Sequence, residues 1–376
     1  MKSQNILIIN STKNISQPLA CLFHELRLKG HFFYLFSKGK TKEDNLFVLA
    51  KKKYFGPQFN NNINLILFFI LYPFLSFYYF FQLLLIKKKS KIEVIILLNW
   101  NEKIIFTPLS FVLKLKVIWL EYPEINLKLI PGLSLFFYKL YSRGAKIISF
   151  LSITKIQYEQ MKFNNNAAVI PLGIKINEPE HQDTIFSSLA KSEQSYFSQK
   201  YFTIGTVVDL NQANQAETLF KAIKKCLEVI NNLQVIIIGD GLEKKNLSWL
   251  AKKMEINNIV WFVGKQAYLK KWLDSFDVYV ITSEEVKLLD LDAVLRAMAQ
   301  GLPVVGPRNK GYEDLVVNGK IGFLIESGNS EVLAQQIIGL YKDKHLCRNL
   351  GKNAREIVDK NYRIDKMAKR FEEVIS

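Results

Sequence analysis

Cysteine and histidine are scarce in this chain, and neither occurs at a spacing typical of a metal site. Cys21, Cys226 and Cys347 lie far apart without a CxxC pair, and the four histidines form no HExxH motif. These patterns indicate neither a disulfide framework nor a zinc site. We therefore expect a protein of a reducing compartment that needs no metal.

Glycine-rich phosphate-binding signatures are also absent. The sequence contains no GxGxxG and no GxxxxGK[ST], which argues against the usual dinucleotide enzymes and against the P-loop class. The N-terminus carries Lys2, but its apolar run, residues 6–9, is too short for a signal peptide and is typical of a first strand. We expect the protein to be cytoplasmic.

Acidic side chains are few in the first half of the chain. The whole chain has 51 Lys+Arg against 34 Asp+Glu, a net charge of +17, and residues 1–180 carry 24 basic and only 10 acidic side chains. This excess indicates an anionic partner, such as a phosphorylated substrate or an anionic membrane surface. No aromatic-interleaved basic patch or known module accompanies it, so we expect no nucleic-acid partner.

The composition and its pattern indicate a two-domain α/β protein. The 376 residues are 49% hydrophobic, which is enough for a sizeable core, and single domains usually span roughly 100 to 200 residues. Short apolar strands alternate with helical lengths, as in parallel sheets covered on both faces. The predicted strands are residues 6–9, 32–36, 94–98, 117–120, 146–150, 168–170, 202–207, 235–238, 259–263, 278–281, 303–305 and 322–324.

A long apolar segment, residues 65–86, stands out within the first half. It contains no charge, and lysines flank both of its ends. Its length permits a membrane span, but Pro73 interrupts it and strand candidates lie on both sides of it. Three interpretations stay open: a helix that covers a sheet, an interfacial helix that dips into lipid, and a true span.

In the second half, several strand ends run into glycine. Gly239 and Gly241 flank Asp240 in IIIGDGLEKKNL, Gly264 follows WFV, and Gly311 follows PRNK. Ligands of an open parallel sheet bind outside the carboxyl ends of strands, where glycine admits a close backbone and helix N-termini attract phosphate. The second half therefore has the features of a nucleotide or phosphate binder.

Seven blocks of the second half, in order and in register, carry a family resemblance. They include IGTVVDLNQANQAETLFKAI from residue 204, AMAQGLPVVG from residue 297 and GYEDLVVNGKIGFLIESGNSEVLAQQI from residue 311. Together they resemble the donor domain of glycosyltransferase family 4, retaining sugar transferases with a GT-B fold. The first half, with LRLKGHFF and AAVIPLGIKIN, is a weaker match.

The resemblance implies two Rossmann-like domains that face a cleft. We place an acceptor-side domain at residues 1–178, a linker at 179–200 and a nucleotide-sugar donor domain at 201–361. A last helix, residues 362–376, would cross back to the first domain, as it typically does in such folds.

The donor motif departs from the family pattern. Asp209 stands where the family has an arginine and Asn214 where it has a lysine, while Leu288 and Arg296 replace the two glutamates of the donor site. In one interpretation Glu284 and Glu285 take over the sugar contacts and new cations supply the positive charge; in another these residues are ordinary solvated charges. The donor-binding candidates are Gly239, Asp240, Gly241, Gly264, Glu284, Arg296, Arg308, Lys310 and Gly311, and the catalytic candidates are Glu121 and Glu285.

Glu121 belongs to the first half, in IWLEYPEI, where the family often has a polar residue that faces the sugar. A carboxylate there could orient an acceptor hydroxyl, although a surface glutamate is the commoner case. Trp100, in LLNWNEK, could stack on a sugar ring or pack in the core.

Two hypotheses follow for the function. In the first, the protein is a hexosyltransferase-type enzyme, peripheral at the inner face of the membrane, that moves a sugar from a nucleotide sugar to a lipid-linked or cell-surface glycan without a metal or other cofactor. In the second, it is a catalytically inactive relative that binds a glycan or a partner.

Overall fold

The computed structural model describes residues 3–12, 15–37, 52–53, 62–122, 132–160, 167–176, 201–211, 214–266 and 268–375. The chain divides into two compact units: the first is Met1–Gly173 with Ile364–Ser376, and the second is Ile174–Arg363. The polar stretch 179–200, predicted as a linker, lies outside the described residues.

The first unit contains a parallel seven-stranded sheet in the order β3-β2-β1-β4-β5-β6-β7. Its strands are β1 (Asn5–Asn10), β2 (Phe32–Ser37), β3 (Lys52–Lys53), β4 (Val94–Leu97), β5 (Lys116–Glu121), β6 (Lys146–Ser149) and β7 (Ala167–Val169).

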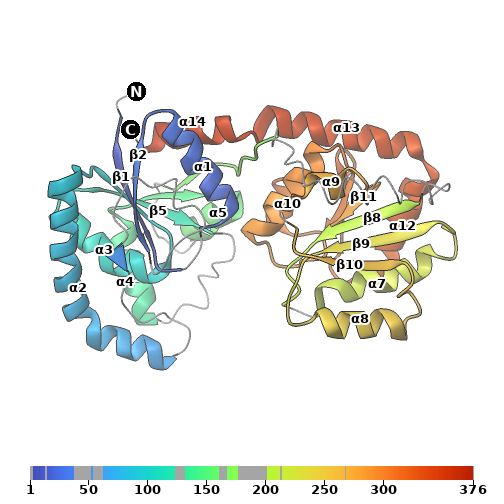
Figure 1. The fold of residues 1–376 in the computed structure, drawn as a ribbon, viewed down its shortest axis with the longest axis horizontal. Helices are drawn as coiled ribbons and strands as arrows, with labels where there is room; N and C mark the ends of the chain where they lie inside the picture. Colours follow the sequence, from blue (N-terminus) through green and yellow to red (C-terminus); the bar gives the residue numbers. More distant parts are fainter. Residues whose placement is uncertain are drawn as a thin grey trace, which may run out of the picture. The chain divides into compact units, whose positions relative to one another are not determined.

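The described part of the first unit has these helices: α1 (Gln17–Leu28), α2 (Asn62–Ser90), α3 (Trp100–Val112), α4 (Gly132–Ser142), α5 (Ser152–Gln160) and α14 (Ile364–Ile375). Although α14 is last in the chain, it packs beside α1 (Figure 1). Glu372 of α14 pairs there with Lys29 and His31.

The second unit contains a parallel six-stranded sheet in the order β10-β9-β8-β11-β12-β13. Its strands are β8 (Phe202–Val207), β9 (Leu233–Ile238), β10 (Val260–Gly264), β11 (Val278–Val280), β12 (Val304–Pro307) and β13 (Gly322–Ile325). Its helices are α7 (Asn214–Cys226), α8 (Lys244–Lys253), α9 (Lys270–Leu273), α10 (Leu288–Ala299), α11 (Lys310–Glu313), α12 (Ser330–Lys342) and α13 (Lys344–Asn361).

Both sheets confirm the predicted α/β class. Every predicted strand is present, with ends that agree within two residues. The short edge strand β3 was not predicted, because two lysines in a basic stretch carry no strand pattern. In each sheet the chain starts in the middle and the strand order reverses, between β1 and β4 and between β8 and β11, as in doubly wound folds.

The apolar segment of the first unit forms α2, which continues through Pro73. One side of the helix joins the hydrophobic core, with Tyr79 buried against Phe36 of β2 and Phe106 of α3. Within the described residues, Ile70–Ser90 is the one helical stretch long and apolar enough to cross a membrane by length and composition. Only 22% of the most apolar part of this stretch is buried.

Candidate functional site

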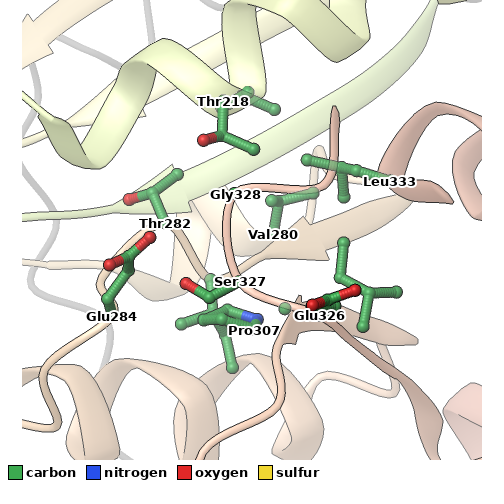
Figure 2. Close-up of a pocket in the computed structure, with 13 residues that line it drawn as sticks. Thr218, Val280, Thr282, Glu284, Pro307, Glu326, Ser327, Gly328 and Leu333 are labelled. Atoms are coloured by element: carbon green, nitrogen blue, oxygen red, sulfur yellow. The ribbon is translucent and has the colours of Figure 1, made fainter. Parts of the chain in front are cut away.

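The candidate site lies in the second unit, at the carboxyl ends of the strands. A pocket that is open to solvent lies there, at the ends of β11, β12 and β13 (Figure 2). Thr218 of α7 and Leu333 of α12 complete its lining. This position adjoins the reversal of strand order, where open α/β sheets bind their ligands.

Polar side chains from two loops line the pocket. Thr282 and Glu284 follow β11, and Glu326 and Ser327 follow β13. Figure 2 shows Thr282 and Glu284 on one side of the pocket and Glu326 on the other. The hydroxyl oxygen of Thr282 is buried and has no hydrogen-bond partner among the described residues. Carboxylates and hydroxyls so placed suit a ligand that is rich in hydroxyl groups.

The charge of the pocket lining is negative. Among the residues that the structure describes, its lining includes Glu284 and Glu326 but no lysine or arginine. Two carboxylates would repel a phosphate group rather than bind it. A phosphorylated ligand would therefore place only its uncharged part here and its phosphates beside cations outside the lining.

Two basic residues that the sequence analysis proposed for donor binding lie within three residues of a lining residue. Pro307 lines the pocket, and Arg308 and Lys310 follow it with exposed side chains. The guanidinium of Arg308 donates to the carbonyl of Leu324 at 3.4 Å, which holds the arginine against the end of β13. Lys310 is the first residue of α11.

Asn309 ties the loop after β12 to the loop after β11. Its side-chain amide donates to the carbonyl of Glu284 at 2.9 Å, and its side-chain oxygen accepts from the backbone N–H of Gly311 at 2.9 Å. Glu284 is thus fixed through its own backbone. Glu285, the neighbouring candidate, is exposed and does not line the pocket.

Arg296 lies in a different hollow of the second unit. Its Nε is 2.8 Å from the carboxylate of Asp292, one turn earlier in α10. The hollow is also lined by Lys175 and Lys270, so its charge is positive. The structure therefore does not bring Arg296 and Glu284 into one pocket.

The glycines after β9 bring two backbones close together. A Cβ on Gly239 would lie 1.8 Å from the carbonyl oxygen of Val208, and a Cβ on Gly241 would lie 2.2 Å from the carbonyl carbon of Leu210. Gly264 has a φ of +73° and accepts a hydrogen bond from the N–H of Gly239 at 3.0 Å. Gly239 and Gly241 are thus needed for close contacts between loops of the protein, and Gly264 is favoured by its positive φ.

The same two loops are joined by side chains. Asn211 donates to the carboxylate of Asp209 at 2.6 Å and accepts from the N–H of Leu242 at 3.2 Å. Asp240 accepts from the N–H of Gly241 at 3.0 Å. Asp209, at the position where an arginine was expected, therefore helps to position Asn211.

Glu121, the candidate of the first unit, is entirely buried at the end of β5. One of its oxygens accepts from Lys103 at 2.7 Å and from the hydroxyl of Tyr138 at 2.5 Å, and Tyr138 shares a further hydrogen bond with Tyr158. Lys103 also donates to the carbonyl of Leu120 at 2.9 Å. Burial lowers the pKa of Lys103, partly offset by Glu121, and raises that of Tyr138.

Aromatic packing covers this buried cluster. Trp100 stacks on Tyr138, with ring centroids 4.2 Å apart and planes 16° from parallel. Glu102, two residues after Trp100, is buried and accepts hydrogen bonds from the N–H groups of Ser11, Leu98 and Asn99. Burial nevertheless raises the pKa of Glu102. Trp100 thus packs on the protein itself.

Sequence reasoning placed Glu284 in the site but missed Thr218, Thr282, Glu326, Ser327 and Asn309. Asn309 carried a usable signal, because asparagine is favoured at the residue before a helix. Glu326 and Ser327 had only their place after a strand, and Thr218 lies inside a helix where no local pattern marks it.

Comparisons with known proteins relate the chain to glycosyltransferases. Residues 188–357 match the family model described as Glycosyl transferases group 1. The N-acetyl-alpha-D-glucosaminyl L-malate synthase of Bacillus anthracis is 30% identical over 164 residues, which cover 41% of this chain and 42% of that protein. The chain therefore spans less than half the length of this curated relative.

Solved structures match over almost the whole chain. Alr3699/HepE of Anabaena, in complex with UDP, has a TM-score of 0.75 at 17% identity and 99% coverage of both chains. A glycosyltransferase from Rickettsia africae ESF-5 has a TM-score of 0.78 at 16% identity, with 100% of this chain and 98% of that chain covered. Residues 188–357 are thus similar to the glycosyl transferases group 1 family, and the fold of the chain is GT-B.

Proposed function

We propose that the protein transfers a sugar from a nucleotide-sugar donor to a glycan acceptor. The observation that carries the proposal is the pocket at the ends of β11, β12 and β13, in which Glu284, Glu326 and Thr282 surround a space suited to a sugar. Carboxylates accept hydrogen bonds from sugar hydroxyls, and such charge-assisted bonds are about twice as strong as neutral ones.

The diphosphate of the donor would lie outside the two carboxylates. Arg308 and Lys310, exposed next to the lining residue Pro307, are the nearest predicted cations in sequence. Their charge, together with backbone N–H groups, would stabilise the leaving diphosphate as the bond to the sugar breaks. We propose that no metal takes part.

The acceptor in this proposal is a lipid-linked or cell-surface glycan, and the transfer retains the anomeric configuration. The basic excess of residues 1–180 supports an anionic lipid surface as the place of work. A cytoplasmic enzyme, peripheral at the inner face of the membrane, fits this charge.

Donor binding tests the proposal first. The structural neighbour from Anabaena is in complex with UDP and, in another structure, with UDP-glucose. Uridine diphosphate sugars are therefore the first donors to screen by thermal shift and calorimetry, followed by GDP and ADP sugars. A ligand at about 100 times its Kd should stabilise the folded protein by about 2.7 kcal/mol.

Two neighbouring glutamates provide a matched pair of variants. Glu284→Gln removes a carboxylate from the pocket, and we expect it to weaken the binding of the donor about tenfold, the usual cost of one charged hydrogen bond. Glu285→Gln makes the same chemical change on an exposed side chain outside the lining and should leave binding unchanged. If Glu285→Gln abolished transfer while Glu284→Gln had no effect, the pocket would be assigned wrongly and the sequence prediction for Glu285 would stand.

The second candidate function is binding without transfer. It is favoured by the negative lining of the pocket and by the ion pair that occupies Glu121. A protein that binds a nucleotide sugar, yet neither hydrolyses it nor transfers its sugar to any glycan supplied, would be of this second kind. Absence of donor binding at millimolar concentration would reject the transferase proposal itself.

A further inference from the structure

The helix α2 presents a continuous apolar stripe to solvent. Ile70, Phe74, Phe77, Phe81 and Leu85 follow one another at helical spacing, and their exposed fractions are 64%, 75%, 69%, 46% and 56%. Tyr78, 47% exposed, lies beside them. This stripe, defined by the six residues, contains one polar atom, the phenol oxygen of Tyr78.

The area of the stripe lies at the upper end of the range found on proteins that stay in water. If each of the six side chains exposes about half of its roughly 200 Å², the stripe covers on the order of 600 Å². The largest apolar patch on a typical monomer is about 300 to 600 Å² and often functional. The stripe therefore calls for a partner.

Basic side chains gather at the C-terminal end of the helix. Lys88, Lys89, Lys91 and Lys114 are exposed, and Glu93 is the exposed acid in the same stretch of sequence. Lys114 belongs to this end because the ammonium of Lys87 donates to the carbonyl of the preceding residue, Leu113.

A basic hollow lies beside the C-terminal end of α3. Its lining includes Lys116, Arg143 and Lys146, together with the exposed ring of Phe111. The pKa of Lys116 is lowered by burial and by the charge of Lys146. An anion near these side chains would relieve the repulsion between them.

We infer that the stripe of α2 docks on an anionic lipid bilayer, with the helix lying in the plane of the interface and the lysines at its end contacting lipid phosphates. An apolar helix face joined to lysines is the composition of interfacial helices. The inference names a partner surface for the proposed enzyme. It rests on the proposed function only as the reason why the protein would work at a membrane. It concerns the first unit alone.

The other face of α2 excludes a helix that crosses the bilayer. Phe68, Leu75, Tyr79, Leu83 and Ile86 are buried in the core of the first unit. A spanning helix would have to remove these side chains from that core and leave the sheet uncovered. The helix therefore dips into one leaflet while it stays packed on the sheet.

A second copy of the chain suits the stripe less well than lipid does. Protein interfaces carry about one hydrogen bond per 100 to 200 Å², and a stripe of roughly 600 Å² would need several donors and acceptors. Its one phenol cannot provide them. Lipid tails need none.

Vesicle flotation with the full chain tests the inference. We expect the protein to float with vesicles that mix phosphatidylglycerol and phosphatidylcholine, and to float less with phosphatidylcholine alone. Phe77→Glu should weaken binding to the anionic vesicles about tenfold or more, because a charge replaces an exposed ring that docking would bury in lipid. Leu242→Glu makes a comparable change at an 86% exposed position of the second unit and should bind like the wild type.

The depth of the helix separates docking from spanning. A nitrobenzoxadiazole fluorophore attached through Phe74→Cys or Leu85→Cys, in a Cys21→Ser and Cys347→Ser background, should report the same shallow depth by lipid-borne quenchers. A spanning helix would place the two probes at depths that differ by about 16 Å, since a helix rises 1.5 Å per residue.

Besides probe depths that differ as in a spanning helix, three results would overturn the inference. They are failure of the wild type to float with anionic vesicles, equal flotation of Phe77→Glu and the wild type, and a dimer that Phe77→Glu dissociates in the absence of lipid binding. No sugar donor is present in these measurements, so their failure leaves the transferase proposal intact. Loss of donor binding in the thermal-shift screen would conversely leave the docking result intact.

Discussion

Glu121 and Lys103 form an ion pair of 2.7 Å inside the first unit, and neither side chain has any exposed surface. The pair joins α3 to the end of β5, where the sequence had suggested an acceptor-facing carboxylate. A charge without its partner would be very costly at this depth. The geometry gives Glu121 a structural role.

We predict that Lys103→Met destabilises the protein by about 3 to 5 kcal/mol, because it leaves Glu121 buried without its cation. The double variant Lys103→Met with Glu121→Gln should recover much of that loss, since no unpaired charge is left. Urea unfolding of the wild type, the two single variants Lys103→Met and Glu121→Gln, and the double variant measures this. If Glu121→Gln kept full stability but lost sugar transfer, Glu121 would act in the chemistry, as the sequence suggested.

The glycine after β9 should tolerate no side chain. Gly239 has a φ of +154°, and its Cβ would overlap the carbonyl of Val208. We expect Gly239→Ala to cost about 1 to 3 kcal/mol and to disturb the loops after β8 and β9 together. Gly339→Ala is the control, because this glycine lies inside α12 with open space around it and alanine should stabilise the helix by about 0.5 to 1 kcal/mol. Equal melting temperatures for Gly239→Ala and the wild type would contradict the prediction.

Asn309 should affect the donor through Glu284. We expect Asn309→Ala to lower stability by about 1 kcal/mol, the usual cost of a lost helix cap, and also to weaken donor binding, because the backbone of Glu284 loses its anchor. Asp343→Ala removes the cap of α13, far from the pocket residues in sequence. It should cost similar stability and leave donor affinity unchanged. If both variants bound the donor alike, Asn309 would be a helix cap and nothing more.

The sequence was sufficient to predict both sheets, because a buried parallel strand is a short apolar run whatever surrounds it. It could not decide how α2 is placed. Apolar residues occur on both of its faces, the buried Leu75 and Tyr79 as well as the exposed Phe74 and Phe77. A helix that is apolar all round has no periodicity to show which side meets the core.

The site was harder to predict than the fold. Glu284 was singled out as a replacement sugar contact in the loop after β11, and Arg296 was grouped with it although two turns of α10 separate Arg296 from the beginning of that helix. Glu326 reaches the same pocket from a strand far along the chain. Such proximity depends on the order of strands in the sheet, which no local motif records. The assignment to family 4 and the roles of the donor residues stay predictions.

The last helix is held to the first unit by a charge cluster that should respond to acid. Glu372 of α14 forms ion pairs with Lys29 and with His31, and Gln4 and Lys116 donate to the carbonyl of Ile375. Burial alone would raise the pKa of Glu372, but the hydrogen bonds from Lys29 and His31 outweigh it and lower that pKa. A carboxyl group with a lowered pKa stabilises the fold above its unfolded value, and this contribution is lost as the pH falls through the folded value.

We therefore predict that the attachment of α14 weakens below about pH 4.3, the ordinary pKa of a glutamate, and that Glu372→Gln costs about 1 kcal/mol at neutral pH. In acid the variant and the wild type should become equally stable, because the wild-type carboxylate is then protonated. Urea midpoints at both pH values and hydrogen exchange of residues 364–375 measure this. Glu373→Gln, a neighbouring substitution for which no ion pair is seen among the described residues, is the control and should leave both quantities unchanged. A constant difference between Glu372→Gln and the wild type at all pH values would mean that the stabilisation comes from packing and not from the charge.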